Sequence, residues 1–349
     1  MSEKRPNKNH IDKLLSSKKA HESQLTPELL YEKINKGDKS GLSEAITLLE
    51  SQRDQDIQKS QELLKKVLPL AGKSIRIGIT GVPGVGKSTF IESFGSYLIS
   101  QGFKVAVLAI DPSSERSGGS ILGDKTRMTE LSKEVNAFIR PTATAGSLGG
   151  VARKTRESIL LCEAAGFDII LVETVGVGQS EIAVHSMTDF FLLLMLAGAG
   201  DELQGIKRGI MEMADAVFIT KCDGENVKKA NAARSEFKAA LHLFPPKENG
   251  WVPKVETVSS YDNKGIDKAW EVISSFKDQL APAGWIQKKR IEQQEFWMKE
   301  TLKDELLRDF YDTPGVQEKI KEVLQQLNNA EITSYQASEK ILAYYNEHK

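Results

Sequence analysis

A glycine-rich segment at positions 78–90, GITGVPGVGKSTF, has residue types and spacing suited to holding a phosphate chain. Its glycines let the backbone curl so that successive N–H groups point at phosphate oxygens, and the start of a following helix adds favourable partial charge. Lys87 can reach the β- and γ-phosphates of a nucleotide, and the Ser88 hydroxyl can bind Mg²⁺. We therefore predict a nucleotide site whose contacting residues are Gly81, Val82, Pro83, Gly84, Val85, Gly86, Lys87, Ser88 and Thr89.

Acidic residues follow three further segments of the chain. Glu173 comes directly after the run FDIILV, Asp111 comes directly after KVAVLAI, and Asp124 lies in the string GGSILGDKTRM. Each acid alone is more often a helix cap or a surface charge, but the carboxyl ends of parallel strands meet at one sheet edge, where ligands bind. Oxygen ligands are those that Mg²⁺ prefers. We predict that Gly176 contacts the γ-phosphate, that the catalytic set is Lys87, Asp111, Asp124 and Glu173, and that the metal ligands are Ser88, Asp111, Asp124 and Glu173.

The string TKCDG at positions 220–224 follows another apolar run and indicates which base is bound. A carboxylate at Asp223 accepts hydrogen bonds from guanine N1–H and the 2-amino group, whereas adenine offers neither donor there. The first position of such a motif is usually Asn, for which Thr220 is a shorter substitute. We predict a guanine nucleotide, GTP or GDP, contacted by Lys221 and Asp223 and by the backbone of Ser259, Ser260 and Tyr261.

These residues must be positioned by a sheet, because short apolar runs alternate with helical stretches along the middle of the chain. Runs that are apolar on both faces and separated by helices predict parallel strands covered on both sides. The fold class is therefore α/β, a P-loop NTPase with a mostly parallel, doubly wound sheet. The strands are expected at positions 74–80, 104–110, 167–173, 189–196, 216–220 and 255–260.

Helical patterns flank this region on both sides. Near the N-terminus, Thr26 followed by Pro27 is typical of a helix cap, and apolar residues then recur at spacings of three and four. The C-terminal part has a long amphipathic stretch, which either packs on the same domain or buries its apolar stripe against a second copy. We expect a flexible N-terminus, a helical extension, a nucleotide-binding domain and a helical arm at positions 1–25, 26–70, 71–282 and 283–349.

Composition narrows the possible classes of protein. The chain has 349 residues, of which 40% are hydrophobic and 27% charged, and its formal net charge of −1 gives no support for a nucleic-acid or anionic-membrane surface. Cys162 and Cys222 are far apart and outside any metal-binding pattern, which is typical of a reducing compartment. The longest apolar run, at 190–200, is too short to span a membrane. Because the N-terminal segment lacks an apolar core, we expect a cytoplasmic location.

The strings GVPGVGKST, DPSS, GGSILGDKTRM, ETVGVGQSE and KCDG, in this order, resemble the MeaB/ArgK family. This family belongs to the G3E branch of P-loop GTPases, named for a Glu in the third nucleotide motif, and the resemblance covers roughly positions 30–345. It implies a nucleotide-binding domain with an N-terminal helical extension and a C-terminal dimerisation arm. It assigns the metal acids to Asp111, Asp124 and Glu173 and the base reader to Asp223, and it marks Gln204 and Lys207 as candidates for coupling to a partner.

The resemblance also implies a function. Members act as GTPase chaperones of an adenosylcobalamin-dependent mutase, typically methylmalonyl-CoA mutase, by gating cofactor loading and by protecting or reactivating the mutase. It therefore implies Mg²⁺ and GTP or GDP as ligands, the mutase as partner and a homodimer. None of the five histidines sits in the sequence context that ligates cobalt, so we expect cobalamin to be the cofactor of the partner and not of this chain.

Two other functions fit a P-loop scaffold. A metallochaperone that inserts metal ions would usually carry Cys- or His-rich segments, which are missing here. A small-molecule kinase would usually carry an Arg-rich lid over the phosphates, whereas the base motif of this chain points to GTP. For the GTPase, slow intrinsic hydrolysis is expected, because Val177 rather than Gln follows Gly176 and the attacking water lacks its usual orienting side chain. Gln179 is the nearest substitute, although solvation or helix capping is the commoner role for such a residue.

Overall fold

The computed structural model describes residues 25–110, 128–142, 148–174, 180–198 and 208–349. The chain forms two compact units, Met1–Arg290 and Ile291–Lys349. Each unit is described by itself below.

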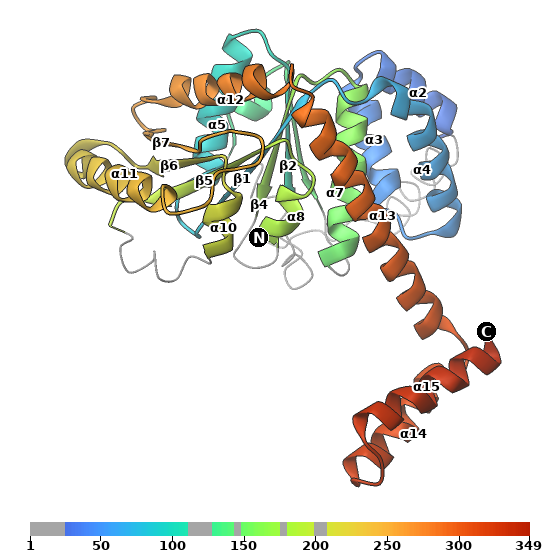
Figure 1. Ribbon diagram of the computed structural model, residues 1–349. Helices are drawn as coiled ribbons and strands as arrows, with labels where there is room; N and C mark the ends of the chain where they lie inside the picture. The colour runs from blue at the N-terminus through green and yellow to red at the C-terminus, as the bar shows by residue number, and fades with distance from the viewer. Residues whose placement is uncertain (1–24, 111–127, 143–147, 175–179, 199–207) are drawn as a thin grey trace, which may run out of the picture. The chain divides into compact units, whose positions relative to one another are not determined.

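The first unit is built on a seven-stranded sheet in which every neighbouring pair of strands is parallel. The strand order is β3-β2-β4-β1-β5-β6-β7, so β1 lies at the centre between β4 and β5 (Figure 1). This arrangement confirms the predicted parallel α/β fold. The strands are β1 (Ile75–Gly81), β2 (Val105–Ile110), β3 (Ala137–Thr142), β4 (Ile169–Thr174), β5 (Phe190–Leu196), β6 (Ala216–Thr220) and β7 (Lys254–Thr257).

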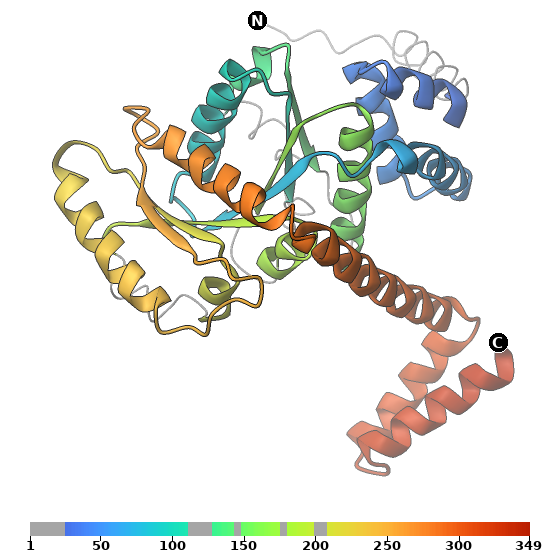
Figure 2. The same cartoon turned by 45° about the horizontal axis from the view of Figure 1, so that its top comes forward.

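Helices cover both faces of this sheet, as the apolar runs predict. Alternate residues of β5 belong to different cores, since Leu192 packs with one cluster and Leu193 with the other. The first cluster includes α5 (Lys87–Ser100) and α12 (Ile266–Leu280), and the second includes α10 (Arg208–Met213) and α11 (Val227–Leu241). Helices α7 (Leu148–Ala164) and α8 (Ser180–His185) complete the cover over β2, β4 and β1 (Figure 2).

Six of the seven strands lie where the apolar runs predict them, but the sequence prediction missed β3. Its sequence, AFIRPT, contains Arg140 and Pro141, which interrupt an apolar pattern. Proline is tolerated in a strand only at a sheet edge, where its missing N–H is not needed for pairing. Strand β3 is at the edge of the sheet, which explains why its sequence lacks the pattern of a central strand.

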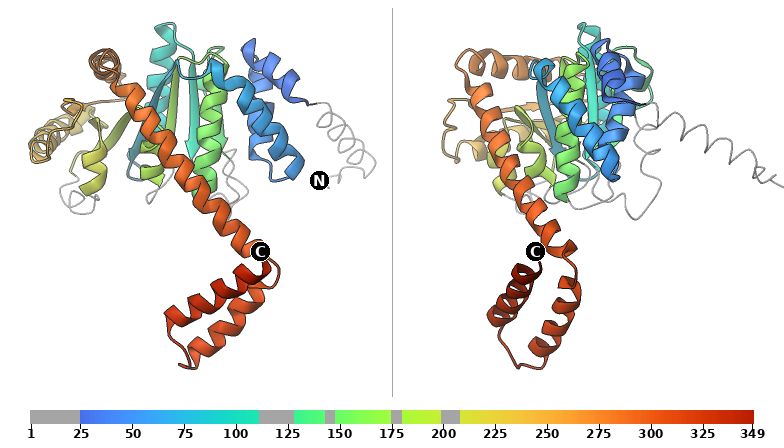
Figure 3. Two further views of the ribbon diagram at one scale, coloured as in Figure 1. Left: turned by 45° about the vertical axis from the view of Figure 1, so that its right-hand side comes forward. Right: turned by 90° about the vertical axis from the view of Figure 1, so that its right-hand side faces the viewer.

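The N-terminal extension consists of three helices, α2 (Pro27–Asn35), α3 (Lys39–Glu50) and α4 (Asp54–Val67). The predicted helix cap is confirmed, because the Thr26 side chain accepts a hydrogen bond from Leu29 N at 3.2 Å with Pro27 in the first turn. The three helices pack on one another and on α7 (Figure 3). Leu30, Leu42 and Leu63 are fully buried in this packing.

The last helix that begins in the first unit is α13 (Trp285–Asp312). Its early residue Arg290 is buried and forms a two-pronged ion pair with Asp189 at 2.6 and 2.8 Å, and it donates to the Ser74 carbonyl at 2.6 Å. The start of α13 is thereby tied to the start of β1. In the second unit, the rest of α13 is followed by α14 (Val316–Asn328) and α15 (Ser334–His348), which pack against each other.

No helix in the described part of the chain is both long and apolar enough to cross a membrane.

Candidate nucleotide site

The predicted phosphate loop joins the central strand β1 to helix α5. Gly81 ends β1, and a Cβ atom there would lie 2.5 Å from the Leu194 carbonyl oxygen, so the close approach of β5 requires glycine. Gly84 and Gly86 have φ values of 77° and 97°, a conformation that favours glycine. Gly86 caps α5 without a side chain, so the N–H groups of the first turn have no helical acceptors. These donors suit the oxygens of a phosphate chain.

Lys87 lies over this loop. Its Nζ donates to the Gly81 carbonyl at 2.8 Å and to the Val82 carbonyl at 3.4 Å, and the residue is 9% exposed. Burial lowers the pKa of Lys87, while the carboxylates of Glu173 and Glu181 act in the opposite direction. A buried ammonium group that donates to two carbonyls of this loop is well placed to bind phosphate oxygens.

Sheet register brings Glu173 to the same loop. Strand β4 pairs with β1 so that Glu173 is opposite Ile79, two residues before the loop begins. The Ser88 hydroxyl donates to Glu173 Oε1 at 3.1 Å, and the Glu173 side chain is buried. A hydroxyl and a carboxylate at the start of a phosphate-binding helix are hard oxygen ligands, so this pair fits Mg²⁺. Glu173 therefore lies at the loop as the sequence predicts.

The last residue of β6 and the residue after it also contact the phosphate loop. The Thr220 hydroxyl donates to the Val85 carbonyl at 2.7 Å and lies 3.1 Å from the Met195 carbonyl. Lys221 Nζ donates to the Gly84 carbonyl at 2.9 Å, and its backbone has a φ of 55°. Thr220 thus braces the phosphate loop from β6, the second strand from β1 in the sheet. An Asn at this position usually makes such a contact with the loop. The short side chain of Thr220 ends at the loop backbone.

The candidate base reader is oriented by the segment after β7. The buried Ser259 hydroxyl donates to Asp223 Oδ2 at 2.7 Å and accepts from Asp262 N at 3.1 Å. The Ser259 backbone exchanges two hydrogen bonds with Lys264, at 2.9 and 3.0 Å, which closes the turn. The sequence predicts a backbone role for Ser259, and the contact of its hydroxyl is an additional finding. This contact uses one acceptor site of Asp223 Oδ2 and leaves the remaining acceptor sites of the carboxylate for a base.

The two neighbours of Ser259 in the motif are placed differently. The Ser260 carbonyl accepts a hydrogen bond from the Ser93 hydroxyl at 3.3 Å, which ties the turn to α5. Tyr261 is 89% exposed, so its ring does not build the site. Any contribution of Tyr261 to nucleotide binding therefore comes from its backbone.

Several predicted residues lie outside the part of the chain that the structure describes. These are Asp111, Asp124 and Gly176 of the predicted catalytic, metal and phosphate sets, together with Gln179, Gln204 and Lys207. Within the described ranges, no group of three or more His, Cys, Asp or Glu side chains could hold a metal ion. The roles of all these residues stay predictions.

One buried acid near the loop was not singled out from the sequence. Glu181 is 3% exposed at the start of α8, and its charge acts on Lys87. It comes eight residues after Glu173 and is the last letter of the string ETVGVGQSE, so the acid itself was visible in the sequence. What the sequence could not show was its burial, because the same letters suit an exposed first turn of a helix.

Removing the Thr220 hydroxyl should weaken nucleotide binding without unfolding the protein. Thr220→Val keeps the shape of the side chain but leaves the Val85 carbonyl without this donor, so the loop loses its brace. We expect GDP affinity to fall about fivefold, as for the loss of one neutral hydrogen bond. Isothermal titration calorimetry measures it. Thr155→Val is the matched control, because Thr155 is equally buried but bonds the Val151 carbonyl within α7; an equal loss there would contradict a specific role for Thr220.

Comparisons with known proteins agree with this geometry. The model of the family "Methylmalonyl Co-A mutase-associated GTPase MeaB" matches residues 42–314. A probable GTPase of Mycobacterium tuberculosis is 48% identical over 310 residues, which cover 89% of this chain and 92% of the relative. The GTPase ArgK of Escherichia coli is 46% identical over 279 residues, covering 80% of this chain and 84% of the relative.

Two further similarities extend the comparison. A mitochondrial protein of Mus musculus, named methylmalonic aciduria type A homolog, is 48% identical over 301 residues, covering 83% of this chain and 72% of that protein. A crystal structure described as a LAO/AO transport system kinase has a TM-score of 0.75 and 35% identity, covering 93% of this chain and 98% of that one. Together with the phosphate loop on the central strand, these matches show that the chain belongs to the MeaB family of P-loop GTPases.

Proposed function

We propose that this protein binds and hydrolyses GTP as a chaperone of an adenosylcobalamin-dependent mutase, with methylmalonyl-CoA mutase as its client. The GTPase part of the proposal rests on one observation. The phosphate loop is contacted both by side chains suited to phosphates and by the segment that contains the candidate base reader. Lys87, Ser88 and Glu173 gather at its phosphate end, and Lys221 links it to the segment of Asp223. The mutase part is supported by the name of the matching family and by its relatives.

At the phosphate end, different residues bind the phosphate oxygens and the metal ion. The N–H groups at the start of α5 and the Lys87 ammonium bind the phosphate oxygens, while Ser88 and Glu173 hold Mg²⁺. When bound, Mg²⁺ neutralises charge that develops on the β- and γ-phosphates. Because Lys87 is already buried and fixed, it needs little reorganisation when the phosphates arrive.

At the base end, Asp223 is fixed before the base arrives. Its Oδ2 atom is held by the Ser259 hydroxyl, so the carboxylate has one orientation in which to accept the two guanine donors. A pre-oriented acceptor lowers the entropic cost of binding. GTP and GDP are the nucleotides that this arrangement favours.

The second unit supports the proposal of a homodimer. Met298, Leu302 and Leu306 are spaced four residues apart on α13 and are 55%, 55% and 61% exposed. Such a stripe on one face of a helix is typical of a surface that pairs with another chain. The arm, proposed to span residues 283–349, would then join two copies while each nucleotide domain stays free to meet the client.

The experiment combines association with turnover. Purified protein is immobilised with GDP or with a non-hydrolysable GTP analogue, and retention of purified methylmalonyl-CoA mutase is measured in each state. We expect retention to depend on the nucleotide, and we expect hydrolysis by the protein alone, on the order of 10⁻³ per second, to rise when the mutase is added.

Two outcomes would contradict the proposal at different points. If the mutase is retained in neither nucleotide state, the client assignment is wrong while the GTPase assignment stands. If the protein alone hydrolyses GTP fast and the mutase leaves the rate unchanged, gating by the partner is wrong.

A further inference from the structure

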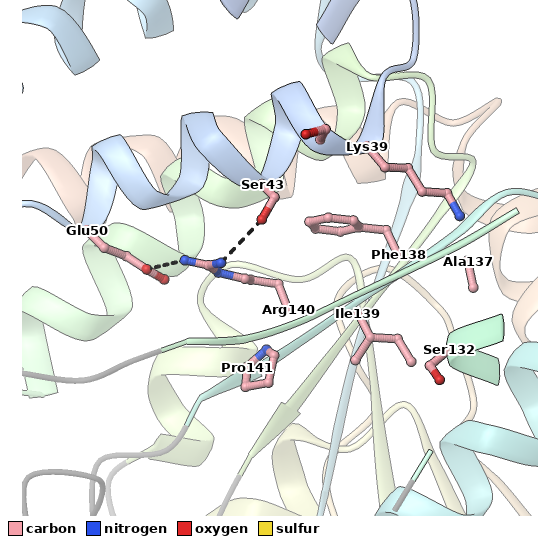
Figure 4. Close-up of a pocket in the computed structure, with 10 residues that line it drawn as sticks. Lys39, Ser43, Glu50, Ser132, Ala137, Phe138, Ile139, Arg140 and Pro141 are labelled. Carbon is pink, nitrogen blue, oxygen red and sulfur yellow. Dashed lines mark hydrogen bonds and ion pairs between the residues drawn. The ribbon is translucent and has the colours of Figure 1, made fainter. Parts of the chain in front are cut away.

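A pocket of about 540 Å³ lies between helix α3 and strand β3, and no residue that lines it belongs to the predicted nucleotide site. Figure 4 shows α3 along one wall, with Lys39, Ser43 and Glu50, and the strand along the other. The volume is in the range of sites that hold ligands. We name this pocket the α3–β3 groove.

The groove follows the edge of the sheet. Strand β3 is the first in the strand order, so among the strands of the described residues it pairs with β2 alone. The groove is lined by five consecutive residues of this strand, 137–141. Because successive side chains in a strand point to opposite faces, consecutive lining residues mean that the groove runs along the strand edge and is not confined to one face.

The ladder to β2 shows which backbone groups point into this edge. Val105 N donates to the Asn136 carbonyl at 2.9 Å, so Asn136 faces β2. The N–H and C=O groups of one strand residue share a side, and successive residues alternate. Phe138 and Arg140 therefore also bond towards β2, and Ile139 presents its N–H and C=O to the open edge.

The residues two positions before and after Ile139 also suit an edge that accepts a further strand. Ala137 and Pro141 share its orientation and present their carbonyl groups. The Ala137 N–H is used by the Glu134 carbonyl at 3.2 Å, and Pro141 has no N–H to leave unpaired. An added strand would thus find one donor and three acceptors, from Ala137, Ile139 and Pro141.

Charged side chains stand at the two ends of the groove. At one end, Lys39 Nζ donates to the Glu134 carbonyl at 3.1 Å, and burial lowers the pKa of Lys39. At the other end, Arg140 Nη2 donates to Glu50 Oε2 at 2.5 Å (Figure 4). Among the described residues, Arg140 Nε and Glu50 Oε1 are buried without a hydrogen-bond partner. Buried polar atoms in folded proteins almost always have a hydrogen-bond partner, so these two atoms suit a polar group that enters the groove.

We propose that the α3–β3 groove binds an extended segment of a partner polypeptide, which adds as a further strand to the edge of β3 and places an acidic side chain at Lys39. The free backbone groups of Ile139 supply the main-chain hydrogen bonds of such strand addition. Amide N–H and C=O groups of the segment supply the partners that Glu50 Oε1 and Arg140 Nε lack. The Lys39 ammonium, which donates to a carbonyl and to no carboxylate in the described part of the chain, selects the acid.

Nuclear magnetic resonance of the full ¹⁵N-labelled chain tests this proposal with defined peptides. The probes are blocked pentapeptides of alternating Thr and Val with one Glu placed in turn at each position, and the same peptides with Gln. We expect at least one Glu peptide to shift the Ile139 amide resonance and to slow its hydrogen exchange about tenfold. Lys39→Gln should weaken binding of that peptide about fivefold and leave its Gln counterpart unchanged.

A second variant tests the main-chain contacts. Ile139→Pro removes the outward N–H without touching the ladder to β2, so it should weaken the Glu and Gln peptides equally, by about tenfold. Unchanged GDP affinity in both variants serves as the control for folding, since neither residue lines the nucleotide site. If Ile139→Pro unfolds the chain, the effect of Lys39→Gln on binding of the Glu and Gln peptides tests the proposal by itself.

Three results would overturn the proposal. One is that no peptide of the set shifts the Ile139 resonance at millimolar concentration. Another is that the Ile139 amide is already protected in the free protein, which would mean that the chain fills its own groove. The third is that a bound peptide is insensitive to both variants, which would place it elsewhere on the surface.

Discussion

Asp223→Asn should change the nucleotide preference of the protein from guanine to xanthine nucleotides. We expect GTP affinity to fall about 100-fold, because the new amide group meets the guanine 2-amino group donor to donor. Xanthine has a carbonyl oxygen in place of this amino group, so the amide N–H₂ pairs with it while the amide oxygen still accepts from N1–H. Affinities for GTP and xanthosine triphosphate, measured by competition against a fluorescent nucleotide, report the exchange.

The contact with Ser259 makes this substitution specific. The Ser259 hydroxyl donates to Asp223 Oδ2 at 2.7 Å, and it can donate equally to an amide oxygen. The amide nitrogen is thereby directed to the base. Ser259→Ala in the same assay should leave the preference for guanine in place while lowering affinity several-fold, since it frees the carboxylate without changing its chemistry. If the Asp223→Asn variant still prefers GTP, another group of the protein recognises the base.

Lys87→Met should abolish hydrolysis while leaving the fold intact. The ammonium group is the one cation that the described residues hold inside the phosphate loop, bonded to the Gly81 and Val82 carbonyls. Its loss removes the charge that stabilises the transferring phosphate, so we expect turnover to fall by at least about 1,000-fold and GDP affinity to fall about tenfold. Single-turnover assays and calorimetry separate the two effects.

The melting temperature of the Lys87→Met variant and a matched variant of Lys221 serve as controls. Burial already disfavours the charged form of Lys87, so an apolar side chain of similar length should not lower the melting temperature. Lys221→Met is the matched variant, because Lys221 also donates to a loop carbonyl, that of Gly84, but is exposed. It should weaken nucleotide binding several-fold with little effect on turnover per bound nucleotide. Equal loss of turnover in both variants would contradict the assignment of Lys87 to the phosphates.

Much of the fold was open to prediction because it rests on local patterns. Apolar runs that are buried on both faces stand out in any window of the chain, and six strands follow them. Thr26 and Pro27 mark a helix start through contacts only three residues long. Strand β3 was missed for the opposite reason, since an edge strand with Arg140 and Pro141 pairs on one side and needs no apolar run.

The candidate site divides in the same way. The glycine spacing of the phosphate loop and the chemistry of Lys87 and Ser88 are properties of a few adjacent residues, so the sequence alone identified them. The contact between the Ser259 hydroxyl and Asp223 joins residues 36 positions apart, and that between Thr220 and Val85 joins residues 135 apart. Such contacts depend on strand order, which no local pattern contains.

By itself, then, the sequence determined the class of chemistry: a loop for phosphates, an acid for a metal, a motif for guanine and the family to which these strings belong. Only the tertiary structure decided which side chains work together. Register between β1 and β4 places Glu173 beside Ser88, and the position of β6 lets Thr220 brace the loop. The edge position of β3 opens the groove beside α3. The physical reason is that side-chain chemistry is local, whereas strand pairing and the partners it creates join distant parts of the chain.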